Sequence, residues 1–317
     1  MDEFSLIDAF FASIGHSRHD VVFGIGDDAA CLRVPPGKDL LVSSDTLVSG
    51  VHFLPSWDAY DIACKAVRVN VSDMAAMGAS PCWLMLALTL PTLDEPWLQR
   101  FSEGLRDSLA YFDMALIGGD TTRGPLSMTM TIHGVIDEGK AVRRSGANAG
   151  DTIYVTGALG AAACALKQRD RCDLDARDRA VLEKKLHTPE PRLDFNDCLQ
   201  AYASSAIDVS DGLCADLQHI GTKSGVGACL FLDNIPVHPL VEKYQGENAL
   251  AFALRGGDDY ELCFTIPPHH EDAFLRTLAA SGLMAYPIGM IESATGLRAK
   301  NVCGDVVPLS AKGYCHF

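Results

Sequence analysis

The chain has 317 residues, 48% of them hydrophobic and 21% charged, and this length predicts about two domains that each bury a core. The net charge of −15 argues against proteins that bind nucleic acids or anionic membranes, because those surfaces attract clusters of Lys and Arg. The 11 cysteines form no Cys-x-x-Cys pair, and no apolar run reaches the roughly 18 residues that span a bilayer, so we expect a cytoplasmic protein.

The first half of the chain alternates between helical and strand patterns. Apolar residues at helical spacing predict helices at residues 5–14, 57–77 and 94–112. Short apolar or alternating runs predict strands at residues 21–23, 40–42, 83–90, 114–117 and 127–132. A polar segment with several glycines, residues 137–151, then predicts a boundary between an N-terminal domain, residues 1–137, and a C-terminal domain, residues 150–317.

The second half of the chain continues the mixture of α and β patterns. A strand is expected at residues 152–156, and helices are expected at residues 160–167 and 174–187, before Pro189 and Pro191 break the chain. Residues 206–212 are typical of a strand that ends in carboxylates and opens a helix, which runs to about residue 224. The predicted fold class is therefore α/β with mixed sheets in both domains.

Six segments rich in Asp, Ser and Gly recur along the chain and are expected to be turns: residues 24–28, 43–46, 70–73, 118–122, 208–212 and 256–259. Each segment alone is an ordinary turn or helix-cap signal. Their recurrence favours a common site, because Asp and Ser oxygens are hard ligands that suit Mg²⁺ and glycine lets a ligand approach the backbone. Carboxylates crowded into one site also repel each other unless cations neutralise them. The pattern thus predicts a metal–phosphate site for ATP-dependent phosphoryl transfer.

Two other nucleotide-binding motifs are excluded by the sequence. Gly24, Gly26 and Ala29 have the spacing of a degenerate dinucleotide fingerprint, but Pro35 and Pro36 leave no room for the helix that must follow. No Gly-Lys pair is followed by Ser or Thr in the frame of a Walker A loop, so the chain is not a P-loop kinase.

Taken in order, the acidic segments resemble the thiamine-monophosphate kinase family nearly from end to end. The matching motifs are GIGDDAA at 24–30, SDTLV at 44–48, VHF at 51–53, VNVSDMAAMG at 69–78, GGDTT at 118–122, DVSDGL at 208–213, DYEL at 259–262 and GYCHF at 313–317. The resemblance implies the two-domain fold of the aminoimidazole ribonucleotide synthetase superfamily. It implies an N-terminal domain that binds ATP and Mg²⁺ and forms a homodimer, and a C-terminal α/β domain that completes the active site.

The resemblance also implies the reaction and its site residues. ATP would phosphorylate thiamine monophosphate to thiamine diphosphate by direct in-line transfer, with several Mg²⁺ ions and no covalent nucleophile, as the last step in making that cofactor. The implied Mg²⁺ ligands are Asp28, Ser43, Ser44, Asp45, Asp73, Asp120, Asp208 and Asp211. The implied ATP contacts are Gly119, Asp120, Arg144 and Ser210. The implied contacts to the thiamine phosphate are His52, Asp258 and Tyr314.

Asp258 departs from the family pattern, because relatives often have Glu at this position and Asp reaches one methylene less far. Two alternatives to the kinase remain. One is another ATP-dependent enzyme of the same superfamily, similar to selenophosphate synthetase or a hydrogenase maturation factor. The other is a non-catalytic protein that binds thiamine phosphates or nucleotides.

Overall fold

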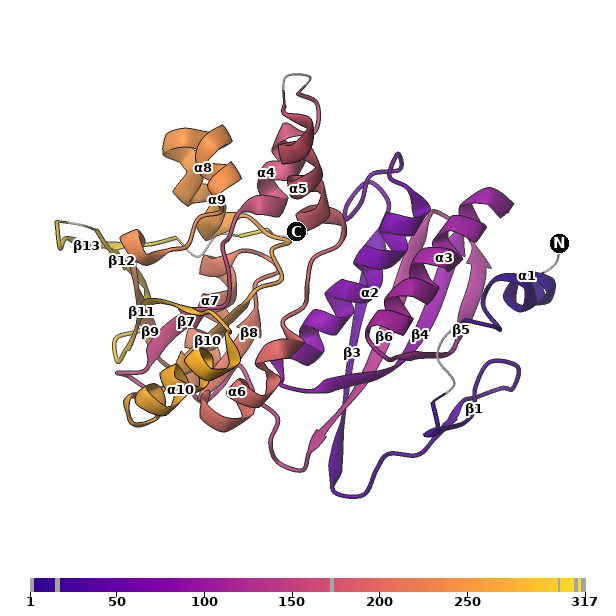
Figure 1. The fold of residues 1–317 in the computed structure, drawn as a ribbon, viewed down its shortest axis with the longest axis horizontal. Helices are drawn as coiled ribbons and strands as arrows, with labels where there is room; N and C mark the ends of the chain where they lie inside the picture. Colours follow the sequence, from indigo (N-terminus) through magenta and orange to yellow (C-terminus); the bar gives the residue numbers. More distant parts are fainter. Residues whose placement is uncertain (1–2, 15–17, 172–173, 302, 311–312, 315–317) are drawn as a thin grey trace. The chain divides into compact units, whose positions relative to one another are not determined.

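The computed structural model describes residues 3–14, 18–171, 174–301, 303–310 and 313–314. The chain divides into two compact units. Unit 1 consists of Met1–Met74 and Ala79–Lys140, and unit 2 consists of Ala75–Gly78 and Ala141–Phe317 (Figure 1). Within the described ranges, no helix is long and apolar enough to cross a membrane.

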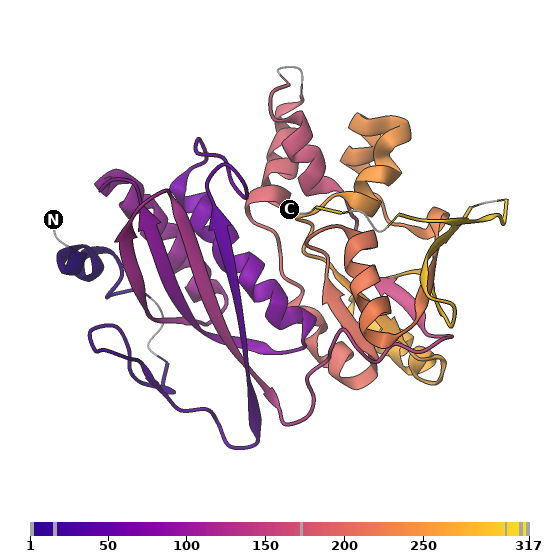
Figure 2. The same cartoon turned by 180° about the vertical axis from the view of Figure 1, so that it is seen from behind.

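Unit 1 is a four-stranded sheet that carries helices on one of its faces (Figures 1 and 2). The strand order is β3-β6-β4-β5, and only β4 and β5 run parallel. The sheet strands are β3 (Lys38–Val48), β4 (Ser80–Leu90), β5 (Ala115–Arg123) and β6 (Ser127–Asp137). The other elements are α1 (Glu3–Phe10), β1 (Val21–Phe23), β2 (Cys31–Leu32), α2 (Ala59–Ala76) and α3 (Glu95–Tyr111).

The two faces of this sheet follow from the alternation along β6. Met128, Met130 and Ile132 are fully buried, whereas the residues between them are only partly buried. Because side chains alternate across a strand, the three apolar residues face the helices and the intervening Thr129 and Thr131 lie on the opposite face. Helix α3 begins at the N-cap Asp94, whose carboxylate accepts the Trp97 amide at 3.1 Å.

Three of the six expected acidic turns are in fact inside regular elements. Residues 43–46 lie in the middle of β3, residues 70–73 lie in α2, and residues 118–122 lie in β5. In β3, all 11 residues are in register with β6. Pairing with a partner strand therefore outweighs the local preference of Ser and Asp for turns, because strand formation depends on cross-strand neighbours more than on intrinsic propensity.

Unit 2 is built on a seven-stranded sheet of order β13-β12-β9-β11-β7-β10-β8, in which only β9 and β12 pair in parallel. The strands are β7 (Thr152–Val155), β8 (Ser205–Asp208), β9 (Gly227–Phe231), β10 (Leu262–Ile266), β11 (Tyr286–Glu292), β12 (Gly296–Lys300) and β13 (Val306–Pro308). The helices are α4 (Ala161–Gln168), α5 (Ala176–His187), α6 (Asn196–Tyr202), α7 (Leu213–Ser224), α8 (Pro239–Gln245), α9 (Ala249–Arg255) and α10 (Pro268–Ser281). Single 3₁₀ turns occur at Leu193–Phe195, Leu232–Asn234 and Gly246–Asn248.

Two hydrophobic clusters cover the two faces of the unit 2 sheet. Ile153 and Val155 of β7 pack in a cluster with α7 and α9, and Tyr154 between them packs in a second cluster with α6 and α10. The second cluster is aromatic: Tyr154 stacks on Phe264 and meets Phe274 edge-on, with ring centroids 5.7 and 5.1 Å apart. The sheet is thus buried on both sides. This burial fixes the end of β8, where one acidic segment of this unit begins, and the start of β10, which follows the other acidic segment.

Candidate functional site

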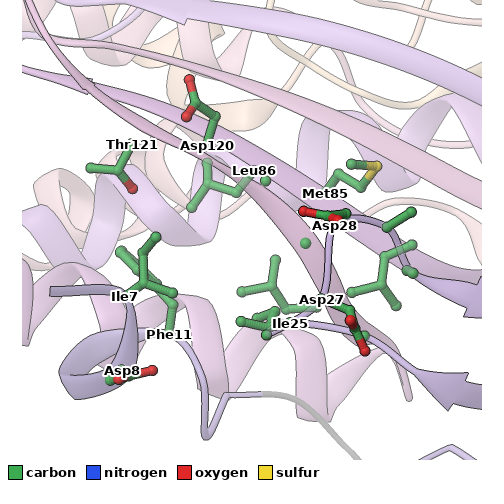
Figure 3. A pocket seen from close by; sticks show the side chains of 18 residues that line it. Ile7, Asp8, Phe11, Ile25, Asp27, Asp28, Met85, Leu86, Asp120 and Thr121 are labelled. Carbon is green, nitrogen blue, oxygen red and sulfur yellow. The ribbon is translucent and has the colours of Figure 1, made fainter. Parts of the chain in front are cut away.

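A pocket in unit 1 has a volume of about 490 Å³ and is lined by three of the predicted site residues, Asp28, Gly119 and Asp120. Its walls are α1, the segment that follows β1, and strands β4 and β5. Figure 3 shows Asp28 beside Met85, with the apolar side chains of Ile7 and Phe11 on another wall. The pocket therefore combines carboxylates with an apolar surface of the kind that accepts a ring.

Glycine at position 119 is required by the way β5 lies against β4. Gly119 has φ of +154°, and a Cβ atom placed there would be 1.8 Å from the carbonyl oxygen of Leu86. Asp120 follows directly, in register with Ala87 of β4. The glycine thus allows the close strand contact that places the Asp120 carboxylate in the pocket wall.

The other predicted metal ligands of unit 1 are divided between the two faces of the sheet. Ser43 and Asp45 lie opposite Ile132 and Met130 of β6, so they share the face that carries the helices. There the Ser43 hydroxyl donates a hydrogen bond of 2.5 Å to Asp73 of α2. Strand and helix residues 30 positions apart thereby form one oxygen-rich group.

Ser44 and His52 lie in different surroundings from that group. Ser44 is on the opposite face of the sheet, where its hydroxyl donates to the carbonyl oxygen of Met130 at 3.1 Å. His52 lies in the turn after β3, and its Nδ1 accepts the Val48 amide at 3.0 Å. In the neutral ring this bond assigns the proton to Nε2.

In unit 2, the turn after β8 is organised by a residue that the sequence patterns did not single out. The Asp216 carboxylate accepts hydrogen bonds from the amides of Ser210, Asp211 and Gly212 at 3.0, 3.1 and 3.1 Å. Burial raises the pKa of Asp216 to about 8, and the negative charges of Asp208 and Asp211 add to this effect. Asp216 thus fixes the backbone of the turn from inside the first turn of α7.

The segment at residues 256–260 lies against this turn. The Asp258 amide donates to the carbonyl oxygen of Ser210 at 2.8 Å, and a Cβ atom on Gly257 would be 2.5 Å from the same oxygen. The Tyr260 hydroxyl donates to the Asp258 carboxylate at 3.0 Å. The structure therefore brings Asp258 next to Ser210, although 47 residues lie between them in the sequence.

The described part of the C-terminal segment reaches the same turn. The Tyr314 amide donates to the carbonyl oxygen of Asp211 at 3.1 Å, and a Cβ atom on Gly313 would be 2.5 Å from that oxygen. Half of the Tyr314 side chain is exposed. Arg144 is separate from this group, beside Ser224 at the end of α7, whose hydroxyl donates to the Arg144 carbonyl oxygen at 3.3 Å.

Within the residues that the structure describes, no three His, Cys, Asp or Glu side chains converge closely enough to hold a metal ion by themselves. The available donors are carboxylates and hydroxyls, which are hard ligands of the type that binds Mg²⁺ through one or two carboxylates and substrate phosphates. The donor chemistry of Asp28, Asp120 and the Ser43–Asp73 pair fits this ion.

Several contributors to these sites were missed by sequence reasoning. The signal for Asp216 was its place four residues after Gly212, in the first turn of an expected helix. Ile7 and Phe11 follow helical spacing, which indicates a buried helix face but not that the face borders a pocket. No local pattern indicates that Tyr260 bonds to Asp258.

Comparisons with known proteins agree with this architecture. The family model described as AIR synthase related protein, N-terminal domain, matches residues 26–136, and the model for the C-terminal domain of the same family matches residues 148–300. Thiamine-monophosphate kinase from Escherichia coli strain K12 is 49% identical over 99% of this chain and 98% of its own length. The predicted two-domain α/β fold of this superfamily is confirmed.

Solved structures give the same result. The crystal structure of thiamine-monophosphate kinase from Stenotrophomonas maltophilia K279a has a TM-score of 0.84 and 43% identity, and covers 89% of this chain and 92% of that chain. The structure of AaThiL complexed with AMPPCP and TMP has a TM-score of 0.79 and 30% identity, and covers 90% of this chain and 89% of that chain.

Proposed function

This chain belongs to the thiamine-monophosphate kinase family, and on that basis we propose that it transfers the γ-phosphoryl group of ATP to thiamine monophosphate. The products are ADP and thiamine diphosphate. The observation that carries the proposal is the 49% identity to the Escherichia coli kinase, which extends over almost all of both chains. The pocket of unit 1 supports it, because Asp28, Gly119 and Asp120 line one cavity together with apolar residues.

The pocket of unit 1 suits the nucleotide. The apolar side chains of Ile7 and Phe11 offer a surface for the adenine ring, and Gly119 allows the phosphates to approach the β5 backbone. Asp120 lies beside this glycine and is proposed to contact the phosphates through a cation, since a bare carboxylate would repel them. Arg144 and Ser210 are proposed as further ATP contacts.

Magnesium is the cation that these residues fit. Its proposed ligands are Asp28, Ser43, Ser44, Asp45, Asp73, Asp120, Asp208 and Asp211. When bound, Mg²⁺ supplies neutralisation of phosphate charge and a template that orients the reacting groups. The short hydrogen bond from Ser43 to Asp73 holds two of these proposed metal ligands in place before an ion binds.

The protein's own residues are proposed to position the reactants rather than to react. A terminal oxygen of the acceptor phosphate forms the new bond to the γ-phosphorus, and the bond from that phosphorus to the β–γ bridging oxygen breaks. His52, Asp258 and Tyr314 are proposed to hold the acceptor. Asp216 keeps the turn of Ser210 and Asp211 rigid, so these side chains do not have to be ordered when substrate binds.

A homodimer and a cytoplasmic location complete the proposal. The face of the unit 1 sheet opposite the helices exposes Leu40 and Val42, and an apolar surface of this kind suits a second copy of the chain. The nine cysteines in the described part of the chain are free thiols, and seven of them are buried, which suits a reducing compartment.

The test is product formation from ATP, Mg²⁺ and thiamine monophosphate, measured by chromatography of thiamine phosphates. We expect thiamine diphosphate in the complete reaction and none when EDTA is present. We expect Asp120→Asn to lower kcat by about 100-fold or more, because the cation that neutralises the phosphates loses a carboxylate ligand. Asp137→Asn is the matched control, since that carboxylate belongs to the same sheet but pairs with Lys38 at 2.6 Å.

Other outcomes of this experiment identify the alternatives. Binding of ATP without thiamine diphosphate formation would contradict the kinase and favour a non-catalytic binder. ATP consumption that requires another acceptor would favour a selenophosphate synthetase-like or hydrogenase maturation factor-like enzyme. Product that persists in excess EDTA would contradict the role of Mg²⁺.

A further inference from the structure

The segment that carries Asp258 has an unusual backbone. Outside glycine, the only described residues with positive φ are Asp113, Asp258 and Tyr260. Asp258 has φ of +69° and Tyr260 has φ of +51°. Asp tolerates the left-handed region, but a bulky aromatic residue there is a genuine outlier. Such an outlier persists only where the surrounding structure holds it in place, and outliers of this kind cluster at functional sites.

Backbone hydrogen bonds to the end of β8 hold this conformation. The Asp258 and Tyr260 amides donate to the carbonyl oxygens of Ser210 and Val209, each at 2.8 Å. The Val209 amide donates in return to the carbonyl oxygen of Glu261 at 2.7 Å. The strained segment is therefore attached directly to the turn that carries Ser210 and Asp211.

Asp259, between the two strained residues, fixes the segment from its other side. Its carboxylate is buried and accepts the Gly160 amide at 2.7 Å, at the start of α4. A buried carboxylate held by the backbone prevents the segment from rotating. The strained conformation is therefore determined by contacts at Val209, Ser210 and Gly160 together.

The conformation has one direct result for side chains: it brings the Tyr260 hydroxyl within 3.0 Å of the Asp258 Oδ1 atom. The phenol hydroxyl is the donor and the carboxylate oxygen is the acceptor, and a hydrogen bond to a carboxylate is stronger than one between two neutral groups. The bond restrains the rotamer of Asp258 before a ligand binds.

We propose that Tyr260 is a positioning residue whose hydroxyl aims the Asp258 carboxylate at the cationic or N–H-donating part of the acceptor substrate. The inference rests on the function proposed above, in which Asp258 contacts thiamine monophosphate. Asp carries its carboxylate on a single methylene, so the position that the carboxylate reaches depends on the direction in which the side chain points. The hydrogen bond from the Tyr260 hydroxyl supplies that direction.

The test compares steady-state kinetics of the full-length wild type and Tyr260→Phe, which keeps the ring and removes only the hydroxyl. We expect KM for thiamine monophosphate to rise by roughly 3- to 10-fold, because the carboxylate must be ordered on binding. We expect kcat and KM for ATP to change by less than about 2-fold, and Tm to stay unchanged. The matched control is Tyr202→Phe, which removes a hydroxyl that lies 2.9 Å from Thr277 elsewhere in unit 2, and it should leave all of these values unchanged.

A double-mutant cycle shows whether Tyr260 acts through Asp258. Asp258→Gly removes the carboxylate and still tolerates φ of +69°. In the Asp258→Gly background, Tyr260→Phe should have no further effect on KM for thiamine monophosphate. Equal effects in both backgrounds, an unchanged KM in Tyr260→Phe, or an equal rise in KM for ATP would overturn the proposal. Absence of kinase activity in the wild type would instead overturn the proposed function.

Discussion

At the scale of single residues, the buried carboxyl group of Asp259 makes stability depend on pH. Burial raises the pKa of Asp259 to about 8, and the nearby Glu261 adds to the rise, although the amide of Gly160 opposes it. In the unfolded chain an Asp titrates near 3.9. Between about pH 4 and 8 the folded state therefore binds a proton that the unfolded state has lost, and stability falls as pH rises through this range.

We predict that Asp259→Asn flattens this dependence. Asn still accepts the Gly160 amide through its side-chain oxygen but has no proton to lose. Between pH 4 and 8, the free energy of unfolding of the wild type should fall by up to about 1.4 kcal/mol more per pH unit than that of the variant. Urea unfolding in buffers of different pH measures the free energy of unfolding of both proteins as a function of pH. Asp305→Asn, at an exposed position, serves as the control, and parallel curves for wild type and Asp259→Asn would refute the prediction.

At the scale of elements, the parallel pair of β4 and β5 depends on one of two adjacent glycines. A Cβ atom on Gly119 would be 1.8 Å from the carbonyl oxygen of Leu86, which is backbone and cannot move aside. A Cβ atom on Gly118 would meet only the terminal methyl of Met85, at 3.7 Å. Position 118 can therefore accept a side chain, whereas position 119 cannot, although the two residues are neighbours.

We predict that Gly119→Ala destabilises the protein by more than about 2 kcal/mol and weakens ATP binding, because β5 must move away from β4 and carries Asp120 with it. Gly118→Ala should change stability by less than about 1 kcal/mol. Thermal unfolding and titration with ATP and Mg²⁺ measure the two effects. The explanation fails if the two variants are equally stable.

At the scale of the whole molecule, the exposed apolar residues of unit 1 bear on assembly. Val42 is 56% exposed and Leu40 is 44% exposed, and both lie on the sheet face that carries no helices. In a dimer formed through this face, a charge at position 42 would be buried without a partner.

We predict that Val42→Lys converts a dimer to a folded monomer, whereas Val181→Lys, at an exposed position of α5 in unit 2, leaves the dimer intact. Sedimentation velocity at micromolar concentration measures the mass of each variant. A wild type that sediments at the mass of one chain would remove the basis of this prediction, and a dimeric Val42→Lys would exclude this face as the interface.

The sequence alone determined the elements whose pattern is local. The helix expected at residues 94–112 is α3, Glu95–Tyr111, because Leu98, Phe101, Leu105 and Leu109 repeat at helical spacing and Asp94 caps the first turn. The strand expected at residues 127–132 is the start of β6. It could be predicted because polar and apolar residues alternate along it, and the apolar ones are buried. The order of the acidic motifs also sufficed to indicate the family, since it needs no knowledge of contacts.

Only the tertiary structure decided how the acidic segments are used. The Ser and Asp residues at positions 43–46 have turn propensity, but pairing with β6 extends them and sends Ser43 and Ser44 to opposite faces of the sheet. Asp216 acquires its role by accepting hydrogen bonds from the turn after β8. Tyr260 acquires its role by donating a hydrogen bond to Asp258. The reason is physical: local preferences are worth a fraction of a kcal/mol per residue, and strand pairing and burial between distant segments exceed them.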